Sequence, residues 1–153
     1  MLKVNIVCVG SVKEKFYIDA IKEYQKRLSR FCSLSVVEVQ EEALEKSIEK
    51  KIDKESEKLM NAFKGAVILL DREGKMTSSE ELAASLDKLS SGGVSEISFV
   101  IGGSNGLSND VIKASKLVLS FGKITYPHQL FRVVLAEQIY RAFAIIAGLP
   151  YHK

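Results

Sequence analysis

Short apolar runs rich in β-branched residues recur along the chain, separated by longer amphipathic stretches. The predicted strands are Leu2–Val9, Leu34–Val39, Ala66–Leu70, Ile97–Ile101 and Leu117–Phe121. Because the runs place apolar residues on both sides of an extended chain, they predict strands that are buried on both faces. Strands of this kind that alternate with helices predict an α/β fold, with a mostly parallel sheet and helices on both of its faces.

Between the strands, apolar residues recur at spacings of three and four, which is typical of amphipathic helices. The predicted helices are Phe16–Phe31, Ala43–Phe63, a segment from Ser78 to about Leu89, a short one from Ser108, and Gln129–Ala147. Ser78 and Glu81 have the spacing of a capping box. In the charged helix Ala43–Phe63 we expect an apolar stripe that includes Leu44 and Ile48, and a polar face that is only solvated. No repeat or linker divides the chain, so residues 1–153 are expected to form a single domain.

The last predicted helix is apolar in almost every direction. Its apolar residues include Val133, Val134, Leu135, Ile139, Phe143 and Ile146. A small domain covers only one stripe of a terminal helix, so we predict that this helix packs across the two-fold interface of a homodimer. The run Leu130–Leu149 is long enough to span a bilayer, but it contains Arg132, Glu137 and Arg141, which are costly there. A membrane partner is therefore not expected.

The charge of the chain is uneven. The 153 residues are 46% hydrophobic and 27% charged, as in a folded soluble protein, and the net charge of +3 is too mild to prove a nucleic-acid partner. Residues 113–153, however, hold six basic side chains and a single acidic one, Glu137. This excess can attract phosphate, although a solvated basic face is the alternative. Cys8 and Cys32 form neither a disulfide framework nor a zinc site, so we expect a cytoplasmic protein without a metal.

A glycine-rich loop follows the predicted strand Ile97–Ile101. Gly102, Gly103 and Gly106 form a G-G-x-x-G pattern, which is neither the dinucleotide fingerprint nor the phosphate loop of nucleoside triphosphatases. Glycines let a backbone approach a ligand closely. The loop is therefore a candidate ligand site, or only a tight turn between a strand and a helix.

The segment Phe121–His128 is a second candidate loop. Gly122 permits an unusual backbone angle, Pro127 fixes another, and the backbone between them offers donors and acceptors to a polar ligand. His128 could be a base, a phosphate contact, or a residue that caps or packs the last helix. Farther along that helix, Glu137 and Arg141 are spaced as an ordinary helical ion pair, and spacing alone favours this interpretation.

Four segments together resemble the RlmH family of ribosomal RNA methyltransferases: Phe99–Gly106, Leu119–Leu130, Arg132–Ala142 and Tyr151–Lys153. The resemblance extends over essentially the whole chain. It implies the SPOUT class, with an α/β fold whose C-terminal part forms a trefoil knot, a homodimer, and S-adenosyl-L-methionine as the cofactor. The reaction it implies is N3-methylation of pseudouridine 1915 of 23S rRNA on the assembled 70S ribosome.

The resemblance also implies site residues. Those for the cofactor are Leu70, Gly102, Phe121, Gly122, Lys123, Ile124, Thr125 and Tyr126. The candidates for catalysis are His128, Arg132, Glu137, Arg141 and His152, among which the sequence does not choose a base. Tyr151 and Lys153 are expected to contact RNA, in a tail that completes the pocket of the partner subunit; a frayed terminus without a role is the alternative.

Two other functions stay open at this point. One is a related knotted methyltransferase that acts on another RNA, such as tRNA. The other is a noncatalytic, ribosome-associated module that binds through its basic C-terminal segment.

Overall fold

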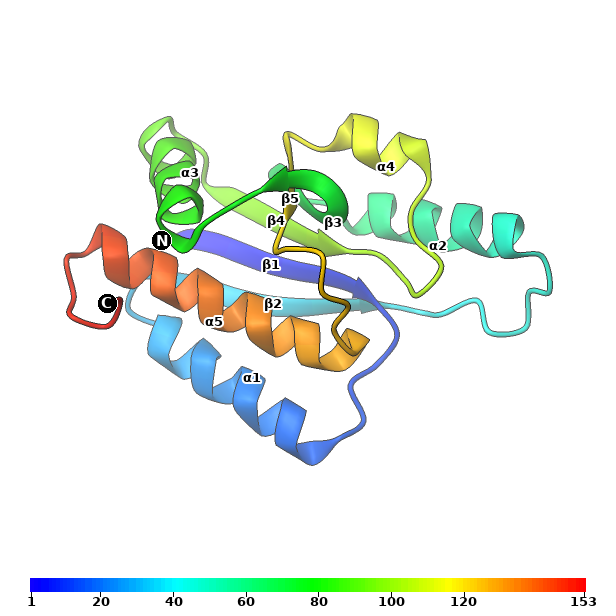
Figure 1. Cartoon of the computed structure of the whole chain (residues 1–153), viewed down its shortest axis with the longest axis horizontal. Helices are drawn as coiled ribbons and strands as arrows, with labels where there is room; N and C mark the ends of the chain where they lie inside the picture. Colours follow the sequence, from blue (N-terminus) through cyan, green and yellow to red (C-terminus); the bar gives the residue numbers. More distant parts are fainter.

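The computed structural model describes all 153 residues and is built around one five-stranded sheet (Figure 1). The strands are β1 (Leu2–Val9), β2 (Cys32–Val39), β3 (Ala66–Met76), β4 (Glu96–Ile101) and β5 (Leu117–Ser120). They lie in the order β2-β1-β4-β3-β5, and every neighbouring pair is parallel. The predicted α/β fold is confirmed.

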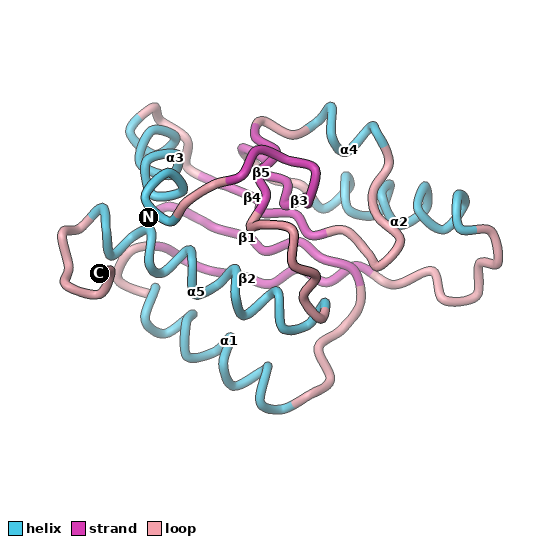
Figure 2. The backbone as a smooth tube through the Cα atoms, in the orientation of Figure 1, coloured by secondary structure: helices cyan, strands magenta, loops and turns pink.

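Helices cover both faces of this sheet. The elements are α1 (Lys15–Leu28), α2 (Ile48–Ala62), α3 (Ser79–Ser91), α4 (Asn109–Ala114) and α5 (His128–Ile146). Alternate side chains of β1 point in opposite directions: Ile6 and Cys8 join the core beneath α1, α3 and α5, whereas Val7 and Val9 join a smaller core beneath α2 and α4. Figure 2 shows the loops that follow β1, β2 and β4 at one end of the sheet.

Helix α5 lies beside α1 and also contacts α3 (Figure 1). The protomer itself buries Leu135, Ile139 and Phe143, and the Phe143 ring stacks on Phe31 with centroids 5.7 Å apart. Val134 is only half-buried, and Ile146 is exposed. One protomer therefore covers part of this apolar helix, and the homodimer stays a prediction, as does the trefoil knot.

Two elements differ from the sequence-based expectation. Helix α2 begins at Ile48 instead of Ala43, because the Ser47 side chain accepts a hydrogen bond from the Lys50 N–H and caps the helix there; Leu44 is 96% exposed. Strand β3 continues past Leu70 to Met76, with a bulge in its pairing to β5. After the bulge, β3 lies so close to β5 that a Cβ at Gly74 would be 2.8 Å from the carbonyl oxygen of Val118.

The charged helix α2 is also more than a solvated face. Glu55 and Ser56 are buried, with Glu55 only 1% exposed, whereas Ile48 of the expected apolar stripe is 62% exposed. The Ser56 hydroxyl accepts from the Ser108 N–H at 3.0 Å, which joins α2 to the segment before α4. Smaller shifts affect α1, which ends at Leu28, and β2, which begins at Cys32.

The structure contains neither a membrane-spanning helix nor a cluster of metal-ligand side chains. None of its helices combines the length and the apolar character needed to cross a membrane. No cluster of three or more His, Cys, Asp or Glu side chains is arranged to hold a metal ion.

Candidate active site

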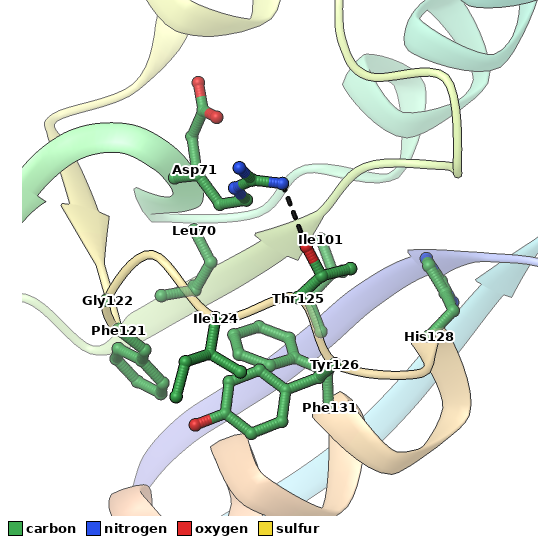
Figure 3. A pocket seen from close by; sticks show the side chains of 11 residues that line it. Leu70, Asp71, Ile101, Phe121, Gly122, Ile124, Thr125, Tyr126, His128 and Phe131 are labelled. Atoms are coloured by element: carbon green, nitrogen blue, oxygen red, sulfur yellow. Dashed lines mark hydrogen bonds between the residues drawn. The ribbon is translucent and has the colours of Figure 1, made fainter.

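A pocket opens at the carboxyl ends of β4 and β5 and beside the bulge of β3, in the region where parallel α/β sheets place their ligand crevices (Figure 3). Its walls come from the middle of β3, the end of β4, the loop after β5 and the first turns of α5. The lining residues are Leu70, Asp71, Arg72, Ile101, Phe121, Gly122, Ile124, Thr125, Tyr126, His128 and Phe131. We call this the apolar pocket, because six of these eleven residues are hydrophobic.

Aromatic rings form one side of the apolar pocket. The Phe131 ring lies with its centroid 5.5 Å from that of Phe121 and 5.5 Å from that of Tyr126. Polar groups lie beside them, where the Arg72 guanidinium donates to the Thr125 hydroxyl at 3.0 Å (dashed in Figure 3). Rings and aliphatic side chains beside a few polar groups suit a ligand with a flat, largely apolar part.

The loop between β5 and α5 is held by local hydrogen bonds and by a glycine. Gly122 has a φ of +109°, a region that other residues rarely adopt, and its N–H donates to the Ser120 hydroxyl at 3.1 Å. At the other end of the loop, His128 Nε2 lies 2.6 Å from the carbonyl oxygen of Gly102. A carbonyl can only accept, so the imidazole proton is on Nε2. The remaining nitrogen, Nδ1, lies 3.5 Å from an Arg132 nitrogen.

The structure gathers most of the proposed cofactor residues in this pocket: Leu70, Phe121, Gly122, Ile124, Thr125 and Tyr126 line it. Gly102 takes part through its carbonyl group, which holds His128. Lys123 is exposed and is not part of the lining.

The sequence interpretation missed four residues that also line the apolar pocket: Asp71, Arg72, Ile101 and Phe131. Asp71 and Arg72 directly follow Leu70, and Ile101 directly precedes Gly102, so including the sequence neighbours of these two named residues would have found them. Phe131 lies three residues after His128 on α5, on nearly the same side of the helix.

Arg132, another of the catalytic candidates, is buried. Its side chain is 1% exposed and donates to the Glu38 carboxylate at 2.7 Å. It also donates to the carbonyl oxygens of Val9 and Gly10, at 2.7 and 3.0 Å. Its Nε has no hydrogen-bond partner. Arg132 therefore ties the start of α5 to the ends of β1 and β2, which makes it a positioning residue.

The other proposed catalytic residues form a separate group at the C-terminal half of α5. Arg141 pairs with Glu137 at 2.8 Å, as the spacing predicted. The Tyr151 hydroxyl donates to the same carboxylate at 2.7 Å, and the Arg141 guanidinium lies 4.7 Å from the Tyr151 ring centroid. His152 Nε2 lies 2.6 Å from Glu80, and Nδ1 lies 3.2 Å from Arg141. These contacts hold the C-terminal tail, Tyr151–Lys153, against α5, with Lys153 exposed.

The contacts around Glu137 shift pKa values in opposite directions. Burial would raise the pKa of Glu137, but the hydrogen bonds from Arg141 and Tyr151 outweigh it, so this pKa lies below its usual value. Burial and the hydrogen bond to Glu137 raise the pKa of Tyr151 to about 12. At neutral pH Glu137 is therefore a carboxylate and Tyr151 a hydrogen-bond donor.

Comparison with known proteins agrees with this geometry. A family model described as "Predicted SPOUT methyltransferase" matches residues 2–152. Ribosomal RNA large subunit methyltransferase H of Clostridium botulinum (strain Alaska E43) is 50% identical, over 99% of this chain and 100% of that protein. The protein of the same name from Lactobacillus acidophilus is 49% identical over the same shares.

A solved structure is similar in fold alone. The probable methylase family protein of Haemophilus influenzae superposes with a TM-score of 0.53 and 12% identity, over 98% of this chain and 70% of that one. The family model over residues 2–152 and the identity of 50% and 49% to the two relatives together assign the chain to a family. The chain belongs to the SPOUT methyltransferases, in the family of the ribosomal RNA large subunit methyltransferase H proteins.

Proposed function

We propose that this methyltransferase uses S-adenosyl-L-methionine to methylate N3 of pseudouridine 1915 of 23S rRNA on the assembled ribosome. The observation that carries the proposal is the apolar pocket, which brings together six of the eight residues expected to bind the cofactor. Relatives that share half of the sequence are named as methyltransferases of large-subunit ribosomal RNA, which supports the substrate class.

The residues of the apolar pocket fit the proposed cofactor. The rings of Phe121, Tyr126 and Phe131 can pack on a flat adenine, and the backbone at Gly122 can approach it closely, since a Cβ there would meet only open space. When bound, S-adenosyl-L-methionine supplies a methyl group on a positively charged sulfur, which a nucleophile attacks in line. The chain's own task is to position the nucleophile and to help it lose a proton.

The group around Glu137 is proposed to act on the RNA. A uracil ring is a weak acid at N3, and a fixed cation beside it favours the anionic form. Arg141 is such a cation, and Glu137 holds its guanidinium in place. Tyr151 offers a ring for stacking, and Lys153 a phosphate contact. Both ring nitrogens of His128 and of His152 lie within hydrogen-bond distance of other groups of the same protomer, so neither imidazole offers a free nitrogen to the RNA.

The position of this group favours a site shared between two subunits. Glu137 follows His128 by nine positions on α5, which is about 14 Å along a helix that rises about 1.5 Å per residue. In a homodimer whose α5 helices cross antiparallel, the end of one helix lies beside the start of the other. The tail Tyr151–Lys153 would then complete the partner's pocket.

Methyl transfer to defined RNA substrates tests this function. The full-length protein is incubated with tritiated S-adenosyl-L-methionine and with 70S ribosomes, 50S subunits, free 23S rRNA or tRNA from a strain that lacks the gene. We expect label in the 23S rRNA of 70S ribosomes. Label in tRNA alone would favour the related tRNA enzyme, and ribosome binding without any transfer or donor binding would favour a noncatalytic module.

A further inference from the structure

The outward face of α1 carries a row of basic side chains. Residues 13–30 hold six Lys and Arg against three Asp and Glu, although residues 1–112 as a whole hold sixteen basic and eighteen acidic side chains. Lys22, Lys26 and Arg30 follow one another at intervals of four residues, and all three are exposed. Lys22 and Lys26 lie on neighbouring turns of α1, about 6 Å apart along its axis, and Arg30 lies in the turn after the helix. We call these three residues the α1 basic row.

The acidic side chains on the same face of α1 are already paired with other residues. Asp19 pairs with Lys15 at 2.7 Å, and Glu23 pairs with Arg27 at 2.8 Å. None of the three members of the α1 basic row has an acidic partner. Like charges on neighbouring turns repel one another, so the row does not stabilise the helix, and it is suited to a partner that carries several negative charges.

The α1 basic row ends beside the C-terminal tail of the same protomer. Figure 1 shows the C-terminal end of α1 next to that of α5. The Arg27 guanidinium lies 5.9 Å from the centroid of the Tyr140 ring, and that ring lies edge-on to Tyr151, with centroids 4.8 Å apart. Arg30, the last member of the row, follows Arg27 by three residues. The row is therefore continuous with the tail Tyr151–Lys153, which is proposed to contact RNA.

We propose that the α1 basic row binds the phosphate backbone of ribosomal RNA beside the target nucleotide. The inference rests on the proposed function, in which the substrate is ribosomal RNA. Phosphates place one negative charge at each nucleotide, so unpaired cations on successive turns fit one strand of RNA. Phosphate contacts fix orientation and carry no sequence information. The row thus adds affinity and orientation, whereas the tail contacts the target nucleotide.

Neutralising the α1 basic row tests ribosome binding without any turnover. The variant Lys22→Gln/Lys26→Gln/Arg30→Gln keeps polar side chains but removes three charges. Filter binding of the full-length protein to 70S ribosomes is measured over a range of salt concentrations, with S-adenosylhomocysteine, the donor without its methyl group, present throughout. We expect about tenfold weaker binding near physiological salt. The slope of log affinity against log salt should become shallower by about two to three, since each lost phosphate contact removes about 0.7 to 0.9.

A matched control removes three exposed lysines around α2, on the opposite face of the sheet: Lys46→Gln/Lys50→Gln/Lys64→Gln. Each variant loses three positive charges, so both have a formal net charge of zero instead of +3. We expect the control to bind ribosomes as the wild type does, and both variants to keep the wild-type affinity for S-adenosylhomocysteine and the wild-type mass in sedimentation. Equal weakening in the two variants would overturn the inference. So would a change of mass in the row variant alone, because this face would then be a subunit interface.

A cross-link identifies what the α1 basic row contacts. Cys8 and Cys32 are buried, so a photoreactive group attached to Lys26→Cys labels a single site. On 70S ribosomes it should cross-link to ribosomal RNA, and cross-links to ribosomal protein alone would overturn the inference. A wild type that methylates ribosomes, with a row variant that binds them as tightly, would overturn the inference alone. A wild type that does not bind ribosomes would overturn the proposed function as well.

Discussion

His128 donates from Nε2 to the carbonyl oxygen of Gly102 at 2.6 Å, and this bond joins the glycine loop after β4 to the first turn of α5. His128 lines the apolar pocket and also a second pocket, which includes Val9 at the end of β1 and Gly103 after β4. Two segments that the sequence indicates as separate candidate loops are thereby parts of one site. His128 thus has a positioning role that does not depend on its acting as a base.

Replacing His128 is expected to weaken donor binding. His128→Ala removes a hydrogen bond to the Gly102 carbonyl, and a net loss near 1 kcal/mol lowers the affinity for S-adenosylhomocysteine by about five- to tenfold. Calorimetric titration measures this change. His152→Ala is the matched control, because the second histidine contacts Glu80 and Arg141 and lines neither pocket. An unchanged affinity in His128→Ala would show that the bond does not shape the site.

Removal of the C-terminal tail is expected to separate binding from catalysis. A chain that ends at Pro150 lacks the hydroxyl of Tyr151 and the imidazole of His152, but it keeps every residue of the apolar pocket. It should bind S-adenosylhomocysteine normally and fail to methylate 70S ribosomes. Full methylation of 70S ribosomes by the shortened chain would contradict a site that is shared between two subunits.

Mixed dimers test whether the tail acts in the partner's site. A Gly122→Trp subunit has a blocked pocket but an intact tail, and the subunit that ends at Pro150 has the reverse. Either variant alone should be inactive. Co-expression should restore up to about half the wild-type activity per mixed dimer, because one of its two sites is then complete. No restoration in purified mixed dimers would indicate that the tail serves its own protomer.

The pKa of Tyr151 gives a direct test of tail docking. This pKa is raised from the ordinary value of 10.0 to about 12, so the neutral phenol is the form that the folded state prefers. The docked tail therefore stabilises the fold fully below pH 10, where Tyr151 is neutral in both states. This stabilisation is lost as the pH rises from 10 towards 12. Ultraviolet titration of the wild type minus Tyr151→Phe isolates this one phenol.

Glu137→Gln is the control for that titration. Burial is the largest cause of the raised pKa of Tyr151 and remains in the variant, so its midpoint should fall only part of the way back. The carboxylate itself has the opposite dependence. Because the pKa of Glu137 is lowered on folding, its contribution is present above the ordinary value of 4.5 and is lost as the pH falls through the folded value. A wild-type midpoint at the ordinary tyrosine value would contradict the docked tail.

Arg132 is expected to matter for stability more than for chemistry. Arg132→Met removes the guanidinium from the Val9 and Gly10 carbonyls and the counter-charge from the Glu38 carboxylate, which should cost about 3 kcal/mol of unfolding free energy. Glu38→Gln should cost only about 1 kcal/mol, since that side chain is partly exposed and Arg132 keeps its other acceptors. Urea denaturation measures both values, and equal losses would be inconsistent with Arg132 as the anchor.

The homodimer can be tested on α5. Sedimentation equilibrium at micromolar concentration should give twice the chain mass of 16.9 kDa. Val134 is half-buried in a surface cleft between α3 and α5, and the seven-residue spacing places it on the same side of α5 as Arg141, so Val134→Glu should shift the protein towards monomer. Ile112→Glu, on α4 at the opposite face of the sheet, is the control and should stay dimeric. A monomeric wild type would remove the interface.

The sequence predicts the sheet well because its strands are apolar on both faces, as in the uninterrupted run Ala66–Leu70. It predicts the start of α2 poorly, since Leu44 continues the apolar spacing and the boundary depends on the Ser47 cap. The ion pair of Glu137 and Arg141 follows from their spacing on one helix. The burial of Glu55 is not visible in the sequence, because it depends on the distant Gly103 loop.

Mass spectrometry of 23S rRNA tests the proposed reaction most directly. Ribosomes from a strain that lacks the gene are analysed before and after incubation with the purified protein and S-adenosyl-L-methionine. We predict the gain of one methyl group, at N3 of a single pseudouridine, in the fragment that contains position 1915. An unchanged mass of that fragment, with a protein that binds the donor, would contradict the proposed function.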